Sequence, residues 1–188
     1  DLTIEEAAEL AKAVNQEVRL ESHPAKFTFA NTLGHRGVLV MRSKVRDLSG
    51  NITNTDPAYE RVEGFGVAKS EVELTLNECM PLEDSEAARI SAQLVNEFTE
   101  KSHMVLERHD VNVRRAADGK LKANVILSRD AGNQLPEFFS INERYGVRFA
   151  CLADMTVEGG ISRLAGMQLV EIPPPSNDIE ADSILRVE

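Results

Sequence analysis

Four arginines are the residues of this chain best suited to bind a small anion. A guanidinium group presents forked N–H donors that match a carboxylate or a phosphate. Each arginine could instead form a surface ion pair or cover apolar surface with its stem. The four candidates are Arg36, Arg115, Arg129 and Arg163. Residue chemistry therefore predicts a module that binds an anion.

The histidines and possible nucleophiles do not have the spacing of a catalytic site. His103 and His109 are six positions apart, which does not place them on one face of a helix, and neither belongs to a known ligand motif. No serine lies in a Gly-x-Ser-x-Gly elbow, and Cys151 lies within an apolar run. We therefore predict no metal ligand and no catalytic residue in this chain.

Composition restricts the possible partners. Lysine and arginine number 21 and acidic residues 31, which gives a net charge of −10 and opposes binding to nucleic acid or an anionic membrane. The two cysteines, Cys79 and Cys151, form no Cys-x-x-Cys motif. No apolar run is long enough to cross a bilayer, and the acidic start is unlike a signal peptide. These features predict a cytoplasmic protein.

Two amphipathic helices and a small antiparallel sheet are predicted in the first part of the chain. Thr3 and Glu6 form a capping box before the first helix, and Asp84 or Ser85 caps a longer one that continues to Val105. A long loop is predicted from Asp47 to Gly66. Three candidate strands are Phe27–Phe29, Val38–Met41 and Val72–Leu76.

Strands and short helices alternate in the last third of the chain. This order predicts a parallel sheet with right-handed crossovers, and ligands of such sheets lie beyond the carboxyl ends of the strands. The loops at those ends would contain Ser128–Gly132, Asp154 and Glu158–Gly160. The predicted elements are strand Ala123–Leu127, a helix from Pro136 to Gly146, strand Val147–Ala153, helix Ile161–Leu164 before Gly166, and strand Met167–Ile172.

The predicted fold class is α/β. It consists of a mixed sheet with a C-terminal parallel βαβαβ unit flanked by helices, together with a small antiparallel subdomain. Residues 1–172 are predicted to form a single domain. Residues 173–188 begin with Pro173–Pro175 and are predicted to be a linker or tail.

Many short motifs, in the same order, resemble archaeal-type cofactor-independent phosphoglycerate mutases of the alkaline phosphatase superfamily. Gly34–Arg42 is similar to the family's Gly-Tyr-Arg-His and the apolar strand after it, and Asn54–Pro57 to its Thr-Asp-Pro-His segment. The further matching segments are Asn96–Phe98, His109–Asn112 with Arg115, Ala123–Asn124, Arg129 with Gly132, Tyr145–Gly146, Ala150–Cys151 and Gly160–Met167.

The resemblance implies a central substrate-recognition domain that holds 3-phosphoglycerate or 2-phosphoglycerate during a glycolytic isomerisation. It implies that the arginines neutralise charge and that Asp56 orients hydroxyl groups. Two divalent metals (Mn, Mg or Zn) and a Ser or Thr nucleophile are expected on a catalytic domain outside this chain, which alone should be inactive. The residues implied to face the substrate are Arg36, Asp56, Asn112, Arg115, Arg129 and Arg163.

Departures from the family pattern leave alternatives open. Ala58 and Gly37 stand where the family has histidines, and Pro173–Ser176 replaces a Gly-Ala-Thr-Gly segment. The parent protein could be a divergent metal-dependent phosphatase, or the chain could be a stand-alone anion-binding module. A metal site within the chain would require clustering of His103, His109, Asp110, Asp56 and Asp154.

Overall fold

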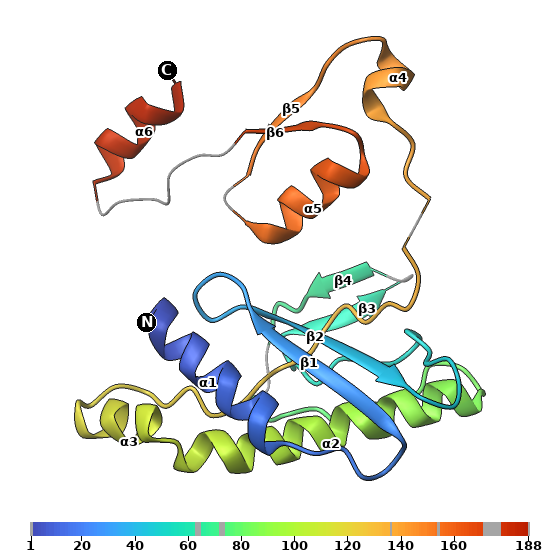
Figure 1. Cartoon of the computed structure of the whole chain (residues 1–188), viewed down its shortest axis with the longest axis vertical. Coiled ribbons are helices and arrows are strands. Elements are labelled where there is room, and N and C mark those ends of the chain that lie inside the picture. Colours follow the sequence, from blue (N-terminus) through green and yellow to red (C-terminus); the bar gives the residue numbers. More distant parts are fainter. Residues whose placement is uncertain are drawn as a thin grey trace. The chain divides into compact units, whose positions relative to one another are not determined.

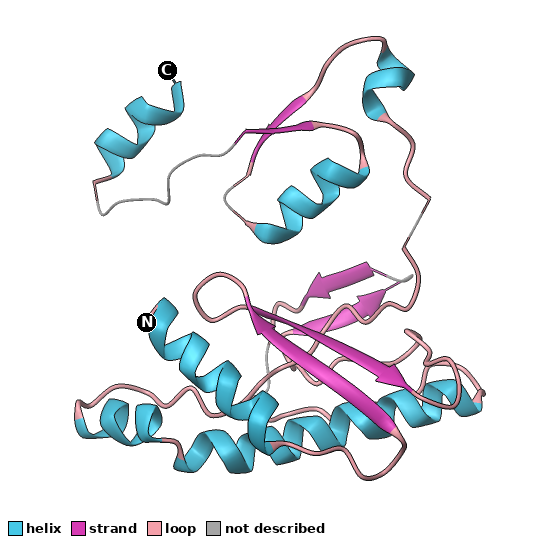
Figure 2. Cartoon of the chain, in the orientation of Figure 1, coloured by secondary structure: helices cyan, strands magenta, loops and turns pink. Residues whose placement is uncertain are grey.

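A computed structural model describes residues 2–62, 65–71, 74–135, 137–153, 155–170 and 178–187 (Figure 1). The fold is mixed α/β, with helices and short strands distributed along the chain (Figure 2). Contacts divide it into two compact units, Asp1–Leu135 and Pro136–Glu188. Among the described residues, the strands form three two-stranded sheets. No described helix has the length and apolar content that a membrane crossing requires.

Three helices frame the first unit. Helix α1, Ile4–Glu17, begins at the predicted capping box, and α2, Glu86–Arg108, begins at Ser85, whose side chain accepts a hydrogen bond from the Ala88 N–H. Both helix predictions are confirmed. Helix α3, Asp110–Ala117, is absent from the sequence prediction because its N-cap is His109, which is not among the usual capping residues.

The strands predicted at Phe27–Phe29 and Val38–Met41 are confirmed, and they form an antiparallel hairpin. Strand β1, Ala25–Asn31, pairs antiparallel with β2, Gly37–Ser43. Half-buried residues alternate with exposed ones along both strands, so one face of the hairpin packs on the core. The rings of Phe27 and Phe29 lie 5.0 and 6.1 Å from that of Phe98, which is fully buried on α2.

The predicted long loop contains a second hairpin, which corrects the loop prediction. Strand β3, Tyr59–Val62, pairs antiparallel with β4, Phe65–Ala68. The strand predicted at Val72–Leu76 is only partly testable, because residues 72 and 73 lie outside the described part of the chain. The remainder is wrong, since residues 74–76 form no strand and the Leu74 side chain is 97% exposed.

The second unit contains one parallel βαβ crossover. Strand β5, Ala150–Leu152, pairs in parallel with β6, Gln168–Val170, and α5, Thr156–Leu164, connects them. The crossover lies in the part of the chain for which the sequence predicted alternating strands and helices. Both strands are shorter than predicted, and residues 171 and 172 of the predicted last strand lie outside the described chain. Helix α6, Ile179–Val187, occupies much of the predicted tail.

The predicted helix before this crossover has the right end and the wrong beginning. Helix α4, Ile141–Tyr145, is capped by Ser140 and ends at Gly146, whose φ of 66° is left-handed. Phe138 therefore precedes the helix, and Pro136, the predicted first residue, lies outside the described chain.

The segment Ala123–Leu127 is not a strand, so the described residues form βαβ and not the predicted βαβαβ. Ala123 and Ile126 pack against the core that α1 and α2 share, and this segment belongs to the first unit. Its apolar run therefore reflects packing against helices.

Whether residues 1–172 act as a single recognition domain is a question of function and stays a prediction.

Glu97 on α2 makes the first unit sensitive to acid. Burial raises the pKa of Glu97, but hydrogen bonds from Lys101, Ser22 and the Glu21 N–H outweigh burial and lower it from 4.5 to about 2. A carboxyl group whose pKa is lower in the folded protein than in the unfolded chain stabilises the folded protein at pH values above its unfolded pKa. This stabilisation is lost as the pH falls from 4.5 towards about 2.

We expect Glu97→Gln to lower the free energy of unfolding by about 2 kcal/mol at about pH 7 and by about 1 kcal/mol at about pH 3, where a carboxyl with a pKa of about 2 is still largely ionised in the folded protein. Urea denaturation at both pH values measures the difference. Glu100→Gln, at an exposed position on the same helix, should change stability little at either pH. An equal loss at both pH values would contradict the assignment.

Candidate anion-binding site

Two loops far apart in sequence are joined by the hydroxyl groups of Thr55 and Ser128. The Thr55 side chain is fully buried, and the two hydroxyl oxygens lie 2.9 Å apart. The Ser128 N–H donates to Thr55 Oγ1 at 2.7 Å, and the Thr55 N–H donates to the Ser128 carbonyl at 2.9 Å. These bonds fix the residues that follow each of them, Asp56 and Arg129, as neighbours.

The conformation of Asp130 adds a further contact between the two loops that contain Thr55 and Ser128. Its φ is +58°, a left-handed conformation that is uncommon for residues other than glycine, and its N–H donates to Asn54 Oδ1 at 3.2 Å. Its carboxylate lies against Gly66 of β4, where a Cβ atom would come within 2.1 Å of Asp130 Oδ1. Gly66 therefore allows the β3–β4 hairpin to approach the second loop.

Arg129 lies at the centre of a cluster of three other side chains. Its guanidinium carbon is 3.8 Å from the centroid of the Tyr59 ring, a cation–π arrangement. Nη1 is 3.9 Å from Asp56 Oδ2, and Nε is 3.6 Å from Asp130 Oδ2. These distances exceed those of hydrogen bonds, so the carboxylates attract the guanidinium without occupying its donors.

Arg129 and Asp56 are both accessible to a ligand. The Arg129 side chain is 38% exposed, and that of Asp56 is 14% exposed. Asp56 Oδ1 accepts a hydrogen bond from the Ala58 N–H, which leaves Oδ2 facing the guanidinium. The pair offers planar N–H donors for an oxyanion and a carboxylate acceptor for a hydroxyl group.

The sequence comparisons identify the family. A sequence model of the 2,3-bisphosphoglycerate-independent phosphoglycerate mutase family matches residues 1–112. The chain belongs to this family. It is 47% identical over 91% of its length to the mutase of that name from Aeropyrum pernix and 36% identical over 92% to that from Methanosphaera stadtmanae. It spans only 40% and 38% of the lengths of these two proteins.

A solved mutase structure shares the fold. The cofactor-independent phosphoglycerate mutase from Thermoplasma acidophilum is 26% identical, with a TM-score of 0.54 over 90% of this chain and 41% of that one. The mixed α/β architecture is therefore that of this mutase family.

Of the six predicted site residues of this mutase-family chain, the structure brings together Asp56 and Arg129. Arg36 lies exposed in the turn between β1 and β2, and no hydrogen bond or ion pair of its side chain is present within the described ranges. Arg163 lies exposed on α5 in the other unit.

The other two, Asn112 and Arg115, are buried and hold the first unit together. Asn112 is fully buried; its amide group donates to the carbonyls of Leu106 and Ala123 at 2.8 and 3.0 Å and accepts from the Ala123 N–H at 2.7 Å. Arg115 is 6% exposed, and its Nη1 lies 2.8 Å from Glu6 Oε2.

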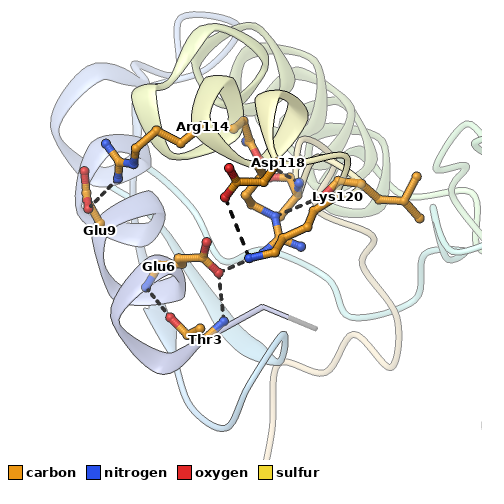
Figure 3. Close-up of polar contacts among 10 residues, drawn as sticks. Thr3, Glu6, Glu9, Arg114, Asp118 and Lys120 are labelled. Carbon is orange, nitrogen blue, oxygen red and sulfur yellow. Dashed lines mark hydrogen bonds and ion pairs between the residues drawn. The ribbon is translucent and has the colours of Figure 1, made fainter.

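Arg115 pairs with Glu6 of α1 and so belongs to an ion-pair network between α1 and α3. Figure 3 shows Glu6 together with Glu9, Arg114, Asp118 and Lys120 of this network. Glu6 accepts from the Thr3 N–H, which lowers the pKa of Glu6, and Arg115 lowers it further against the opposing effect of burial. Glu9 pairs with Arg114 at 3.7 Å, and Asp118 with Lys120 at 3.9 Å. The contacts of Arg115 thus join two helices.

Three of the four histidines of this mutase-family chain have structural contacts. His103 Nδ1 lies 2.8 Å from the Asn124 carbonyl oxygen, His109 caps α3, and His23 Nε2 lies 3.0 Å from Ser43 Oγ. Within the described residues, no group of three or more His, Cys, Asp or Glu side chains could hold a metal ion. Asp154, named in the metal alternative, lies outside them.

Sequence reasoning missed Tyr59 and Asp130, which complete the environment of Arg129. Asp130 is adjacent to Arg129 in sequence, so its proximity could have been anticipated. Tyr59 lies 70 positions away, and its only signal is an aromatic residue shortly after the Asp56–Pro57 turn.

Burial raises the pKa of Cys79 to about 11, which keeps its thiol protonated.

Proposed function

We propose that this chain is the substrate-recognition part of a phosphoglycerate mutase that interconverts 3-phosphoglycerate and 2-phosphoglycerate. The observation that carries the proposal is the placement of Arg129, whose donors face no acceptor at hydrogen-bond distance among the described residues, while Tyr59 and Asp56 hold the guanidinium in position. In this role Arg129 binds the carboxylate or phosphate, and Asp56 orients a hydroxyl group. Membership of the mutase family supports the choice of substrate.

The exposed arginines Arg36 and Arg163 are proposed as further recognition groups. The Arg129 cluster has a local charge of −1, since one guanidinium faces the carboxylates of Asp56 and Asp130. An anionic substrate therefore needs additional cations. Asn112 and Arg115 are proposed to act indirectly, because their side chains are engaged in the contacts that position the loops.

We propose that the catalytic chemistry resides in the part of the protein outside this chain. The described residues do not form a metal-ligand set, so no step is assigned to a metal here. Two divalent ions (Mn, Mg or Zn) held by the remaining part would stabilise the attacking and leaving oxygens. The contribution of this chain is to bind and orient the substrate.

The surface of the second unit supports contact with such a catalytic part. Val157, Ile161 and Leu164 of α5 are exposed at positions i, i+4 and i+7, which form one face of a helix. Leu152 on β5 is 59% exposed. Parallel sheets are normally covered on both faces, so we propose that the remaining polypeptide covers this unit and extends its sheet.

A small phosphorylated acid is the proposed ligand, in preference to nucleic acid or a membrane surface. The net charge of −10 supports this preference, because a polyanion would be repelled by the protein as a whole. A cytoplasmic location belongs to the same proposal, since the substrates are glycolytic intermediates.

The complete protein and the 188-residue chain should be assayed side by side, each with Mn²⁺ and 3-phosphoglycerate. We expect 2-phosphoglycerate to form with the complete protein and neither product nor inorganic phosphate to form with the chain alone. Turnover by the chain alone would refute its role as a recognition part. Release of inorganic phosphate by the complete protein, without isomerisation, would identify the phosphatase alternative, for which Ala58 and Gly37 are the sequence observations.

A further inference from the structure

The outer face of the β1–β2 hairpin carries a shallow hollow at the end away from the β1–β2 turn. Its volume is about 340 Å³, near the lower limit for small-molecule sites. The hollow is lined by Lys26, Phe27, Thr28, Arg42, Ser43 and Lys44. Three of these six residues are cations, in a protein whose net charge is −10.

The cations are arranged in a way that costs stability unless an anion is present. Lys26 and Arg42 are directly opposite each other in the strand register, and like charges in that relation repel. Lys44 lies two residues beyond Arg42 at the edge of the hollow. In the part of the chain that the structure describes, these three side chains make no ion pair or hydrogen bond.

Several other cations of the same unit are paired with carboxylates. Arg46 contacts Glu86, Arg89 lies 2.6 Å from Asp84, and Lys101 lies 2.7 Å from Glu21. Carboxylates are thus plentiful elsewhere on this unit. What distinguishes the hollow is that three cations with no carboxylate partner among the described residues line one small space.

Ser43 fixes the backbone at the edge of the hollow. Its hydroxyl oxygen accepts hydrogen bonds from the N–H groups of Val45 and Arg46 at 3.2 and 3.3 Å and lies 3.0 Å from His23 Nε2. The Lys44 N–H donates to the Pro24 carbonyl at 2.9 Å. These bonds hold the Lys44 backbone beside the strand ends, so the three cations approach one another from fixed positions.

We propose that this hollow binds a multivalent oxyanion of the phosphate class, with Lys26, Arg42 and Lys44 as the charged donors and the Thr28 hydroxyl as a neutral one. Arg36 lies six residues from Arg42 along the hairpin, a distance of roughly 20 Å at the rise of a β-strand. A single small anion cannot span that distance. The site is therefore separate from recognition by Arg36, and it does not depend on the proposed function.

Titration of the full 188-residue chain with inorganic diphosphate, followed by backbone amide NMR, tests this proposal. We expect saturable shifts centred on the amides of Thr28 and Ser43. The double variant Lys26→Gln/Arg42→Gln should bind at least about tenfold more weakly, since it loses two of three cations. Both residues are exposed, so the remaining spectrum should be unchanged and report an intact fold.

The matched control is Lys12→Gln/Lys69→Gln, which removes two exposed positive charges elsewhere. It should bind diphosphate within about twofold of the original chain, because separated surface charges are screened by salt. Arg129→Gln should also leave binding unchanged, which separates this site from the proposed recognition site. Equal weakening in both double variants, or no saturable shift in the original chain, would overturn the proposal.

Discussion

Asn112→Ala is expected to lower the free energy of unfolding by about 3 kcal/mol. The Asn112 side chain makes three hydrogen bonds from a fully buried position. Alanine would leave the N–H and carbonyl of Ala123 without the partner they have here, and an unsatisfied buried polar group costs about 1–3 kcal/mol. Denaturant unfolding of the 188-residue chain, followed by circular dichroism, measures the loss.

Val113→Ala is the matched control, because Val113 is the next residue of α3 and is 55% exposed. It should change stability by less than about 0.5 kcal/mol. If Asn112→Ala kept full stability and lost only substrate binding, Asn112 would be a recognition residue, as the family resemblance implied. A large loss of stability in Asn112→Ala alone would establish the structural role that its burial indicates.

On the proposed function, Arg129→Gln in the complete protein should lower kcat/KM for 3-phosphoglycerate about 100-fold, or roughly 2.7 kcal/mol. Glutamine keeps a polar side chain but removes the positive charge and the forked donors that meet an oxyanion. The side chain is 38% exposed, so we expect little loss of stability. Steady-state kinetics and a thermal melt of the same preparation measure the two effects separately.

Substitutions around the guanidinium show what positions it. Arg129→Lys keeps the charge but not the planar fork, so an intermediate loss of about tenfold is expected. Tyr59→Phe keeps the aromatic face that lies 3.8 Å from the guanidinium and should leave kcat/KM nearly unchanged. Tyr59→Leu removes that face and should lower kcat/KM. Arg89→Gln, in a surface pair with Asp84, should leave kcat/KM unchanged. Unchanged kinetics in Arg129→Gln would exclude Arg129 from substrate binding.

Local signals predicted the two long helices and the first hairpin well. The Thr3–Glu6 capping box and the Ser85 cap mark α1 and α2 correctly, because N-caps are set by residues within one turn of the helix start. The hairpin follows from alternation around Phe27 and Phe29, which face the core. Gly146 marks the end of α4, since its φ of 66° favours glycine.

A strand was wrongly predicted from an apolar run whose residues are buried by helices and not by a sheet. Residues 123–127 have the composition of a buried strand, but the Ala123 N–H donates to the Asn112 side chain, the Ala123 carbonyl accepts from it, and Ile126 packs on the helical core. Periodicity records which residues are buried and not what covers them. The β3–β4 hairpin was missed for the opposite reason, since its strands are only four residues long.

The sequence by itself determined the family, the two long helices and the first hairpin, because these depend on local patterns and on ordered motifs, and it placed Arg129 among the candidate site residues. Only the tertiary structure decided which predicted residues share a site. It joined Asp56 to Arg129 through Thr55 and Ser128, added Tyr59, and buried Asn112 and Arg115 in contacts between helices. Such decisions rest on hydrogen bonds between residues distant in sequence, whose geometry no local pattern specifies.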